Sequence, residues 1–537
     1  MSKNNPWLAL SALCVGFFMI LLDTTIVNVA IPAMLNGVHA SLNEIVWVNS
    51  IYLLTYAVPL LVCARLGDRF GPKRLFLGGL AVFTLASLWC GLAPTATDLI
   101  VARAVQGLGA AAMTPQTMAF IAYLFPSNRG AAMGVWGAVA GGATVSGPLL
   151  GGILVETLGW EWIFYVNVPV GLIGLVAAAF LVPDWQPRHS HRFDPLGILL
   201  SSAGMFALVF GIQNGQHYDW GTVAGPITVF EIITAGVLLL VAFVIWQRGG
   251  PSEPLLPLAV FNDRTFSAGN LVNITMGFAL AGMFYPLTIY FQSVLGMTPL
   301  QAGLLTAPMS VLSGLVAPFA GRASDRISGK YVVILGLTTF TAGVLLLAWL
   351  SQPDSGVAAL LPGLLLTGFG VGCVFAPLTN ASIAGLRAQF IGAGSGIFNT
   401  SRQVGGVLGS AAIGVLLQAR LSVSLPEAAR AQAEQLPPEI RGQFVAAFNS
   451  SAGSAGEFAG ATAGHVPPGV PPQLAETIKQ AATSAFDIGF TNASKATLLL
   501  PAAVLLLGAL FAAAMRRRQP VPVSPSAQPA PTGSPTG

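Results

Sequence analysis

Charged residues are scarce in this chain. Asp, Glu, Lys and Arg together make up 8% of its 537 residues, whereas about 25% is usual in soluble proteins. Hydrophobic residues make up 54%, more than polar side chains could cover in water, so the composition predicts a protein of the lipid bilayer. The formal net charge of +4 is distributed between apolar runs and forms no basic patch. No nucleic-acid partner is therefore expected.

The sequence also lacks the usual signs of a metal site or an enzyme. All four cysteines lie inside apolar runs without the spacing of metal ligands, and we interpret them as small buried hydrophobic residues. No GxxxxGK[ST] loop for nucleotide phosphates occurs, and no nucleophile–base pair lies near a membrane interface. Enzymatic activity, ATP-driven transport, a metal and an organic cofactor are therefore not expected.

Apolar residues gather instead in fourteen stretches, each close to the length of about 20 residues that a bilayer-spanning helix needs. The seventh and eighth are interrupted by Gln213 and Glu231. The stretches lie at 7–35, 45–64, 75–94, 98–123, 131–155, 163–182, 195–215, 225–247, 265–293, 300–321, 331–351, 357–384, 391–418 and 491–515.

The positive residues between the stretches predict their orientation. The short connections near 36–44, 95–97, 156–162, 216–224, 294–299 and 352–356 contain no lysine or arginine. Positive residues occur in the connections that alternate with them, at 65–74, 129, 188–192, 248–264, 322–330, 387 and 516–518. Because positive residues are retained on the cytoplasmic side, this pattern predicts an even number of spans in the cytoplasmic membrane, with both termini in the cytoplasm.

Two segments outside the spans have a composition of their own. Residues 419–490 are rich in Ala, Pro, Gly, Ser and Gln and fall on the outer side, where we predict a mobile cap with one or two short helices. Within it, Leu425–Phe448 has a helix-forming composition. Residues 516–537 end in a stretch rich in Pro and Ser and are expected to form a disordered cytoplasmic tail.

Two cytoplasmic connections repeat each other. Arg65 to Lys73 reads RLGDRFGPK, and Arg322 to Lys330 reads RASDRISGK. Many secondary transporters consist of repeated halves with the substrate site between them. We therefore predict an all-α membrane protein with two pseudo-symmetric six-helix bundles at 1–182 and 265–515, the second including the external segment, joined by a linker with two further spans at 183–264.

Five motifs follow one another in the first half of the chain. They are Leu22-Asp23-x-Thr25-x-Val27-Asn28-x-Ala30-x-Pro32, Asp68-Arg69-x-Gly71-x-Lys73, Arg103-Ala104-Val105-Gln106-Gly107, Gly142-x-x-x-x-Gly147-Pro148-x-x-Gly151 and Trp160 to Pro169. In this order they resemble the major facilitator superfamily, specifically its fourteen-span drug/proton antiporter branch, over about residues 7–515. Glu161 departs from the pattern, because the branch usually has arginine there.

The resemblance implies a major facilitator fold and a function. It implies a monomeric proton-coupled antiporter that exports lipophilic drugs or toxic compounds by alternating access, with the proton gradient as energy source and no cofactor. Small-molecule substrates, protons and the lipid bilayer would be its partners. A dedicated exporter of an endogenous metabolite, siderophore or lipid is one alternative, and a receptor that binds ligand without flux is another.

Asp23 is the leading candidate for function, because a carboxylate near the middle of a membrane span costs about 2.5–3.5 kcal/mol. It lies about 24 Å along the first span, and Arg103 lies near the outer end of the fourth, which runs in the opposite direction. We expect the two to meet in the outer half of the first bundle. Burial and a nearby cation act in opposite directions on a carboxyl group's affinity for protons, so a conformational change could switch it. A static ion pair joining two helices is the structural alternative.

A second group of residues is predicted to control conformation. The repeated loop resembles a latch whose aspartate pairs with an arginine and a helix N-terminus in one state only; a simple cytoplasmic anchor is the alternative. In the fifth span, small residues allow close helix packing and a proline can kink the helix, although packing alone would also explain them. The candidates are Asp68, Arg69, Gly71, Lys73, Asp325, Arg326, Gly147, Pro148 and Gly151.

A third group is predicted to contact substrate or to assist coupling. Arg402, in the thirteenth span, needs an acidic or carbonyl partner and should face the interior; with Gln403 it resembles the Arg103-x-x-Gln106-Gly107 pattern of the fourth span. Reaching toward water is the alternative for Glu231, and core or lipid packing is the alternative for the aromatic residues. The candidates are Asn28, Gln106, Glu231, Arg402, Gln403, Phe284 and Tyr290.

Overall fold

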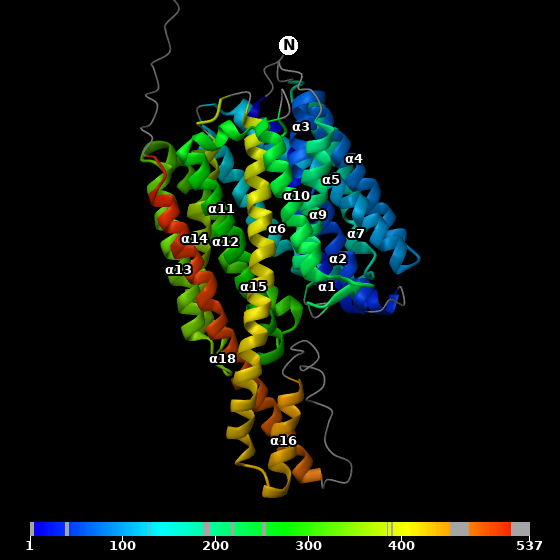
Figure 1. The fold of residues 1–537 in the computed structure, drawn as a ribbon, viewed down its shortest axis with the longest axis vertical. Coiled ribbons are helices and arrows are strands. Elements are labelled where there is room, and N and C mark those ends of the chain that lie inside the picture. The colour runs from blue at the N-terminus through cyan, green and yellow to red at the C-terminus, as the bar shows by residue number, and fades with distance from the viewer. Residues whose placement is uncertain are drawn as a thin grey trace, which may run out of the picture.

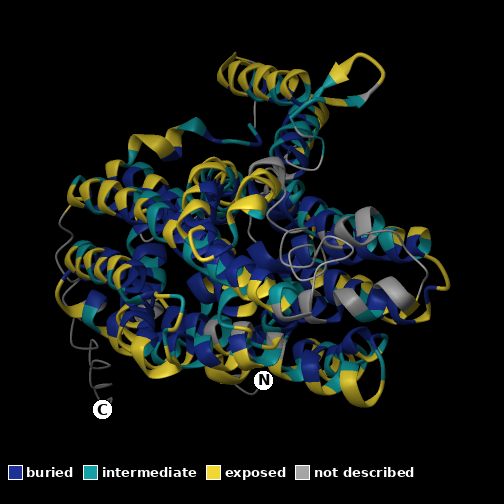
Figure 2. Ribbon diagram, turned by 90° about the horizontal axis from the view of Figure 1, so that it is seen from below, coloured by how far each residue is buried: buried dark blue, intermediate teal, exposed yellow. Residues whose placement is uncertain are grey.

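Long apolar runs form helices in a bilayer because each backbone polar group must find its hydrogen-bond partner within its own segment. The computed structural model describes residues 5–516 except 38–41, 127, 186–193, 216–217, 219, 250–253, 384, 388–389 and 452–471. Its helices run mostly along one direction, with the N-terminus at one end (Figure 1). Their buried faces point inward and their exposed faces outward (Figure 2).

The N-terminal helices, α1–α8, carry most of the motifs. Pro59 precedes α3, and the axis bends by 52° between α2 and α3, as expected where proline interrupts a helix. The bounds are α1 (Pro6–Gly37), α2 (Leu42–Ala57), α3 (Leu60–Phe70), α4 (Pro72–Leu92), α5 (Ala96–Leu124), α6 (Arg129–Thr157), α7 (Trp162–Tyr165) and α8 (Asn167–Leu181).

A helical pair follows, α9 (Pro195–Asn214) and α10 (Val229–Gly249), connected through the short antiparallel strands β1 (Thr222–Ala224) and β2 (Ile227–Thr228). Asp194 caps the first turn of α9 by accepting a 2.9 Å hydrogen bond from the Gly197 amide. The same carboxylate accepts hydrogen bonds from Trp246 Nε1 at 2.9 Å and from Gln247 Nε2 at 2.6 Å. One buried acid therefore joins the start of α9 to the end of α10.

The C-terminal helices begin after the short helix η1 (Leu258–Asn262). Thr298 and Gln301 form a reciprocal capping box at the start of α12. The bounds are α11 (Arg264–Ile289), the π-helical turn η2 (Tyr290–Val294), α12 (Pro299–Arg326), α13 (Gly329–Leu350), α14 (Val357–Ile383), α15 (Ile391–Ala433), α16 (Pro438–Ser451) and α18 (Pro472–Ala513).

The two repeated loops make the same contact in both halves of the chain. Lys73, in the first turn of α4, donates a 2.7 Å hydrogen bond to the Ala179 carbonyl near the end of α8. Lys330, in the first turn of α13, donates a 2.5 Å hydrogen bond to the Ala513 carbonyl at the end of α18. A cation at a helix C-terminus satisfies an orphan carbonyl and interacts favourably with the helix dipole. The repeat seen in the sequence is thus also a repeat of contacts.

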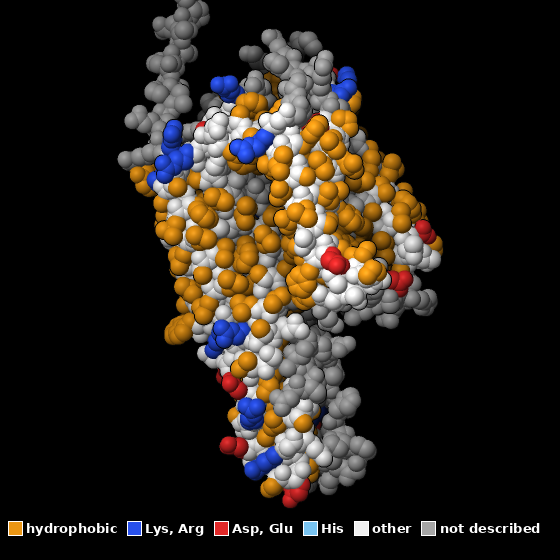
Figure 3. Space-filling view, viewed as in Figure 1, with side chains coloured by type: hydrophobic (Ala, Val, Ile, Leu, Met, Phe, Trp, Pro, Cys, Tyr) orange, Lys and Arg blue, Asp and Glu red, His pale blue; other side chains and the backbone are white. Residues whose placement is uncertain are grey.

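The surface is that of a membrane protein. Hydrophobic side chains cover a broad band around the helices, while most charged side chains gather at its ends and on the extension below (Figure 3). Large side chains such as Phe180, Trp349 and Leu510 are 69–78% exposed. In the described residues, eleven helices are long and apolar enough to span a bilayer, or twelve with the bent α2–α3 pair. A count of fourteen also needs α5 and α6.

The external segment differs from the prediction. The predicted short helix is present as α16, but the two long helices α15 and α18 also continue outward beyond the others, with α16 packed beside them (Figure 1). Apolar side chains such as Leu425, Phe444 and Phe486 are buried between these helices. Alanine is both a strong helix former and small enough for close packing, so an alanine-rich segment that resembles a loop in composition extends the spans.

Candidate functional site

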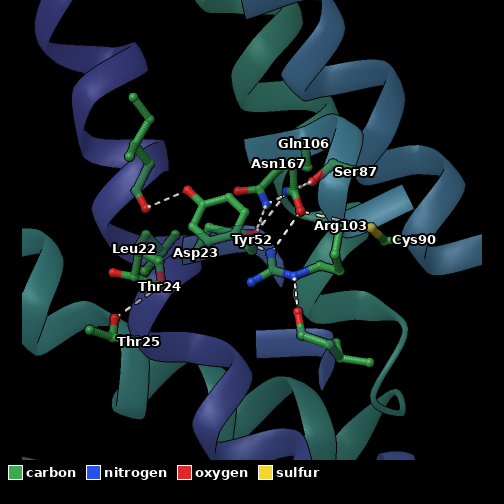
Figure 4. A network of polar contacts seen from close by, with 12 residues as sticks. Leu22, Asp23, Thr24, Thr25, Tyr52, Ser87, Cys90, Arg103, Gln106 and Asn167 are labelled. Carbon is green, nitrogen blue, oxygen red and sulfur yellow. Dashed lines mark hydrogen bonds and ion pairs between the residues drawn. The ribbon is translucent and has the colours of Figure 1, made fainter. Parts of the chain in front are cut away.

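A fully buried charged pair joins α1 to α5. Asp23 and Arg103 are both 0% exposed, and the Arg103 Nη1 atom forms an ion pair with Asp23 Oδ2 (Figure 4). Arg103 also donates a 2.7 Å hydrogen bond from Nη1 to Gln106 Oε1 and a 3.3 Å hydrogen bond from Nε to the Val48 carbonyl. The expected meeting of Asp23 and Arg103 is therefore observed.

The second oxygen of the Asp23 carboxylate is held by amide groups. Oδ1 accepts a 2.9 Å hydrogen bond from Gln106 Nε2 and a 3.3 Å hydrogen bond from Asn167 Nδ2. Both amides also donate to Ser87 Oγ, at 2.8 and 3.0 Å. Four helices, α1, α4, α5 and α8, therefore meet at one carboxylate. A change in its charge would alter the contacts of all four.

Aromatic rings cover the guanidinium of Arg103. Its Cζ atom lies 4.1 Å from the ring centroid of Tyr52 and 5.7 Å from that of Phe164. The Tyr52 hydroxyl donates a 3.3 Å hydrogen bond to the Ile20 carbonyl, which fixes the ring against α1. Such rings stabilise a cation by their negative faces. Arg103 Nη2 has no hydrogen-bond acceptor among the described residues. This nitrogen could therefore donate to a new acceptor if the arginine moved.

Glycines bring these helices close enough for the cluster to form. A Cβ atom on Gly107 would lie 2.1 Å from Thr55 Oγ1 and 2.6 Å from the Tyr52 carbonyl oxygen, so α2 and α5 approach through a bare backbone. A Cβ on Gly147 would lie 1.9 Å from the Oγ1 atom of Thr25, two residues after Asp23. The fifth-span motif therefore packs directly beside the carboxylate's turn of α1. Gly151 is also buried, whereas the side chains of Pro148 and Asn28 lie outside the described residues.

Three members of the cluster were not predicted. Gln106 was named as a possible coupling residue, and it contacts the carboxylate directly. Tyr52, Ser87 and Asn167 were missed. Asn167 carried a signal, because it is the only polar side chain between Val166 and Pro169 within a recognised motif. Ser87 carried none, because serine is common in packed membrane helices.

The end of α3 has a different kind of contact. Asp68 is buried, and its Oδ2 atom lies 4.0 Å from Arg65 Nη1 without accepting a hydrogen bond from the described residues. Arg65 donates to the carbonyls of Pro254 and Leu255 at 2.5 and 3.1 Å, which joins the loop to the segment before η1. Gly71 adopts a φ of 96° after α3, a conformation that favours glycine.

Two of the remaining conformational candidates lie on the surface of the molecule. Arg69 and Arg326 are exposed, and the Arg69 guanidinium lies 5.5 Å from the Phe70 ring centroid. The side chain of Asp325 lies outside the described residues.

The predicted substrate contacts are scattered. Glu231 is exposed and accepts a 2.7 Å hydrogen bond from the Thr228 amide at the start of α10. Tyr290 is buried in the core of the C-terminal helices, where its hydroxyl donates to the Gln352 carbonyl at 2.5 Å, and Phe284 packs against the same core. These contacts fit the structural alternatives. None of the three contacts the Asp23 cluster within the described part of the chain.

Arg402 is partly exposed, and its guanidinium lies 5.9 Å from the ring centroid of Phe375 on α14. Its likeness to the Arg103 pattern is not a structural equivalence. Arg103 lies on the fourth span of the N-terminal helices, whereas α15 is the fifth of the C-terminal ones. A short sequence match between spans does not fix their place in the repeat.

Comparison with known proteins shows the family of this chain. The sequence profile of the Major Facilitator Superfamily matches residues 13–410. An uncharacterized MFS-type transporter of Mycobacterium tuberculosis is 44% identical over 83% of this chain and 78% of its own. The tetracenomycin C resistance and export protein of Streptomyces glaucescens is 32% identical over 99% and 96%. The solved structure of a proton:xylose symporter superposes with a TM-score of 0.57 over 84% of this chain and 95% of the symporter chain. At 12% sequence identity, this similarity shows the fold alone.

Proposed function

Because the chain belongs to the Major Facilitator Superfamily, we propose that it is a proton-coupled antiporter that exports lipophilic drugs or other toxic compounds by alternating access. It is a multi-pass membrane transporter and not an enzyme. Under this proposal, fourteen spans form two six-helix bundles and an additional pair in the cytoplasmic membrane, with both termini in the cytoplasm. A single chain suffices, and the proton gradient supplies the energy without a cofactor.

The buried carboxylate of Asp23 carries the proposal. A membrane-buried acid marks a site of proton or ion handling by default. Protonation of Asp23 would remove the charge that holds Arg103, and the arginine could then turn its unused Nη2 donor to another acceptor. Because Gln106 and Asn167 bind the same carboxylate, the packing of α1, α4, α5 and α8 would respond to the proton.

The position of α1 links this site to the two sets of helices. Phe17, on α1, stacks on Trp136 of α6 with centroids 4.1 Å apart, in a cluster that includes Ala376 and Ile383 of α14. In the proposed orientation, these contacts lie closer to the cytoplasm than Asp23. They join the N-terminal helices to the C-terminal helices. A shift of α1 on protonation would therefore act on the contacts that close the cytoplasmic side. This is the element that alternating access requires.

Everted membrane vesicles test the proposed function. With the chain in the membrane and an acidic interior imposed, a panel of lipophilic dyes and antibiotics should contain compounds that accumulate inside. An uncoupler should abolish this accumulation, because no other energy source is proposed. Accumulation that survives the uncoupler, or requires ATP, would refute proton antiport.

The same panel separates the two kinds of exporter. The tetracenomycin C relative is named for a single compound, which favours a dedicated exporter as the second candidate. A dedicated exporter would accumulate one structural class, whereas a multidrug exporter would accumulate several unrelated ones.

Asp68→Asn should lower turnover by about tenfold while dye binding changes by less than about twofold. Asp68 is buried beside Arg65, which holds the segment before η1, so the substitution biases a conformational equilibrium rather than the substrate site; such couplings are about 5–150-fold. Vesicle uptake and equilibrium dye binding measure the two effects separately. Turnover equal to that of the wild type would indicate that the loop only anchors the chain.

A further inference from the structure

One partly exposed cation within a membrane span has no ion-pair partner among the described residues. Arg402 lies eleven residues after the start of α15, about 16 Å along it, and thus near the middle of a hydrocarbon core about 30 Å thick. Ion pairs occur at Arg65–Asp68 and Asp23–Arg103 in the described part of the chain, and neither includes Arg402. The guanidinium of Arg402 contacts only the Phe375 ring, with no hydrogen-bond acceptor in the described part of the chain. An unpaired arginine at this depth is costly and therefore indicates function.

The face of α15 that carries Arg402 points to the interior. Asn399, one turn before it, is 1% exposed and donates a 3.2 Å hydrogen bond from Nδ2 to Met118 Sδ on α5. This contact crosses from the C-terminal to the N-terminal helices. Residues three apart lie on the same side of a helix. Arg402 therefore lies on the side of α15 that faces the N-terminal helices, one turn further along the helix than Asn399. Leu408, on another side of α15, is 39% exposed and faces outward.

Unsatisfied polar atoms accompany the cation. The Oδ1 atom of Asn399 has no donor among the described residues, and neither has Oδ1 of Asn273 on α11. The Asn273 Nδ2 atom donates to the Phe398 carbonyl, which fixes that side chain against the same turn of α15. A buried polar atom without a partner is unfavourable, because it has lost its hydrogen bonds to water. The guanidinium needs an acceptor and the amide oxygens need a donor, so together they match a ligand that carries an anionic oxygen beside a hydroxyl or N–H group.

We propose that Arg402 binds an anionic oxygen group of the transported compound, a carboxylate being the simplest case, while Asn399 Oδ1 accepts from a neighbouring hydroxyl or N–H group of the compound and its aromatic part lies against Phe375. The planar fork of a guanidinium matches a carboxylate in two parallel hydrogen bonds. The ring of Phe375 offers a flat surface beside it. The inference rests on the proposed transport function, because it assigns a substrate chemistry to the interface between the two sets of helices.

Binding of two matched dyes to the purified full-length chain tests the subsite. Rhodamine B carries a free carboxylate, and its ethyl ester has the same ring system without that charge. By fluorescence polarisation, the wild type should bind rhodamine B about tenfold more tightly than the ester, a difference of about 1.4 kcal/mol. Arg402→Gln should remove this preference and leave ester affinity within about twofold, whereas Arg402→Lys should keep part of it. Arg420→Gln, on the exposed outer part of α15, is the control that should change neither dye.

Two outcomes would overturn the subsite. The wild type could bind both dyes equally, or Arg402→Gln could weaken both equally, as expected of an arginine that only supports the fold. Because the measurement involves no pH gradient, it is independent of proton coupling. A chain that selects the carboxylate dye but does not transport it would refute the proposed function and support the subsite.

Discussion

Asp23→Asn should abolish export driven by a pH gradient while leaving the folded chain in the membrane. Asparagine has nearly the shape of a protonated aspartate, so the variant should be held in one protonation state. Its amide oxygen can still accept from Gln106, and Arg103 keeps the Val48 carbonyl, Gln106 Oε1 and the rings of Tyr52 and Phe164. These contacts should compensate for much of the lost charge partner.

Vesicle uptake of an exported dye under an imposed pH gradient measures the effect, and size-exclusion chromatography of the solubilised chain measures folding. Glu156→Gln, an exposed carboxylate in the last turn of α6, is the matched control and should transport as the wild type does. Gradient-driven uptake by Asp23→Asn at the wild-type rate would refute its role as proton carrier. A static ion pair predicts the opposite pattern, with less folded protein and full coupling in what remains.

Arg103→Leu should be the most destabilising single substitution in the cluster. It leaves a carboxylate that is 0% exposed without its cation, and removal of one partner from a buried ion pair costs about 3–5 kcal/mol. Combining it with Asp23→Asn should restore much of the folded protein, because both charges are then gone. Transport should not return, since the titratable group is missing.

Thermal unfolding of the detergent-solubilised variants measures this cycle. Arg103→Lys is a useful third variant, because it keeps the charge but loses the fork that reaches both Asp23 and Gln106; it should lie between the wild type and Arg103→Leu in stability. If the double variant is no more stable than Arg103→Leu alone, the destabilisation comes from lost packing against Tyr52 rather than from an unpaired charge.

The central pair could be predicted from sequence because polar side chains are rare in these helices. Asp23 and Arg103 interrupt apolar runs on antiparallel spans. A charged side chain within a membrane span is costly unless it is paired, so contact between the two was the simplest expectation. Gln106 followed from its spacing of three residues from Arg103. Ser87 could not be predicted to join them, because nothing in the pattern of α4 specifies the rotation of that helix, whereas Asn167 lies in a recognised motif that did not by itself indicate which residue it contacts.

Two other errors have different physical causes. The outer ends of α15 and α18 were predicted as a cap with one or two short helices, although alanine-rich helices continue once they can pack on Leu425 and Phe486. Arg402 was compared with Arg103 because their sequences look alike. Their places in the repeat differ, since the repeat is defined by helix order and contacts, such as those of Lys73 and Lys330.

Proton movement in proteoliposomes tests the role of Asp23 most directly. The purified chain is reconstituted in weakly buffered vesicles that contain a pH-sensitive dye, and an exported compound is added on one side without a pH gradient. The wild type should move protons in the direction opposite to the compound. Asp23→Asn should exchange labelled compound across the membrane but move no protons. Proton movement by Asp23→Asn equal to that of the wild type would contradict the assignment of this carboxylate as the coupling group.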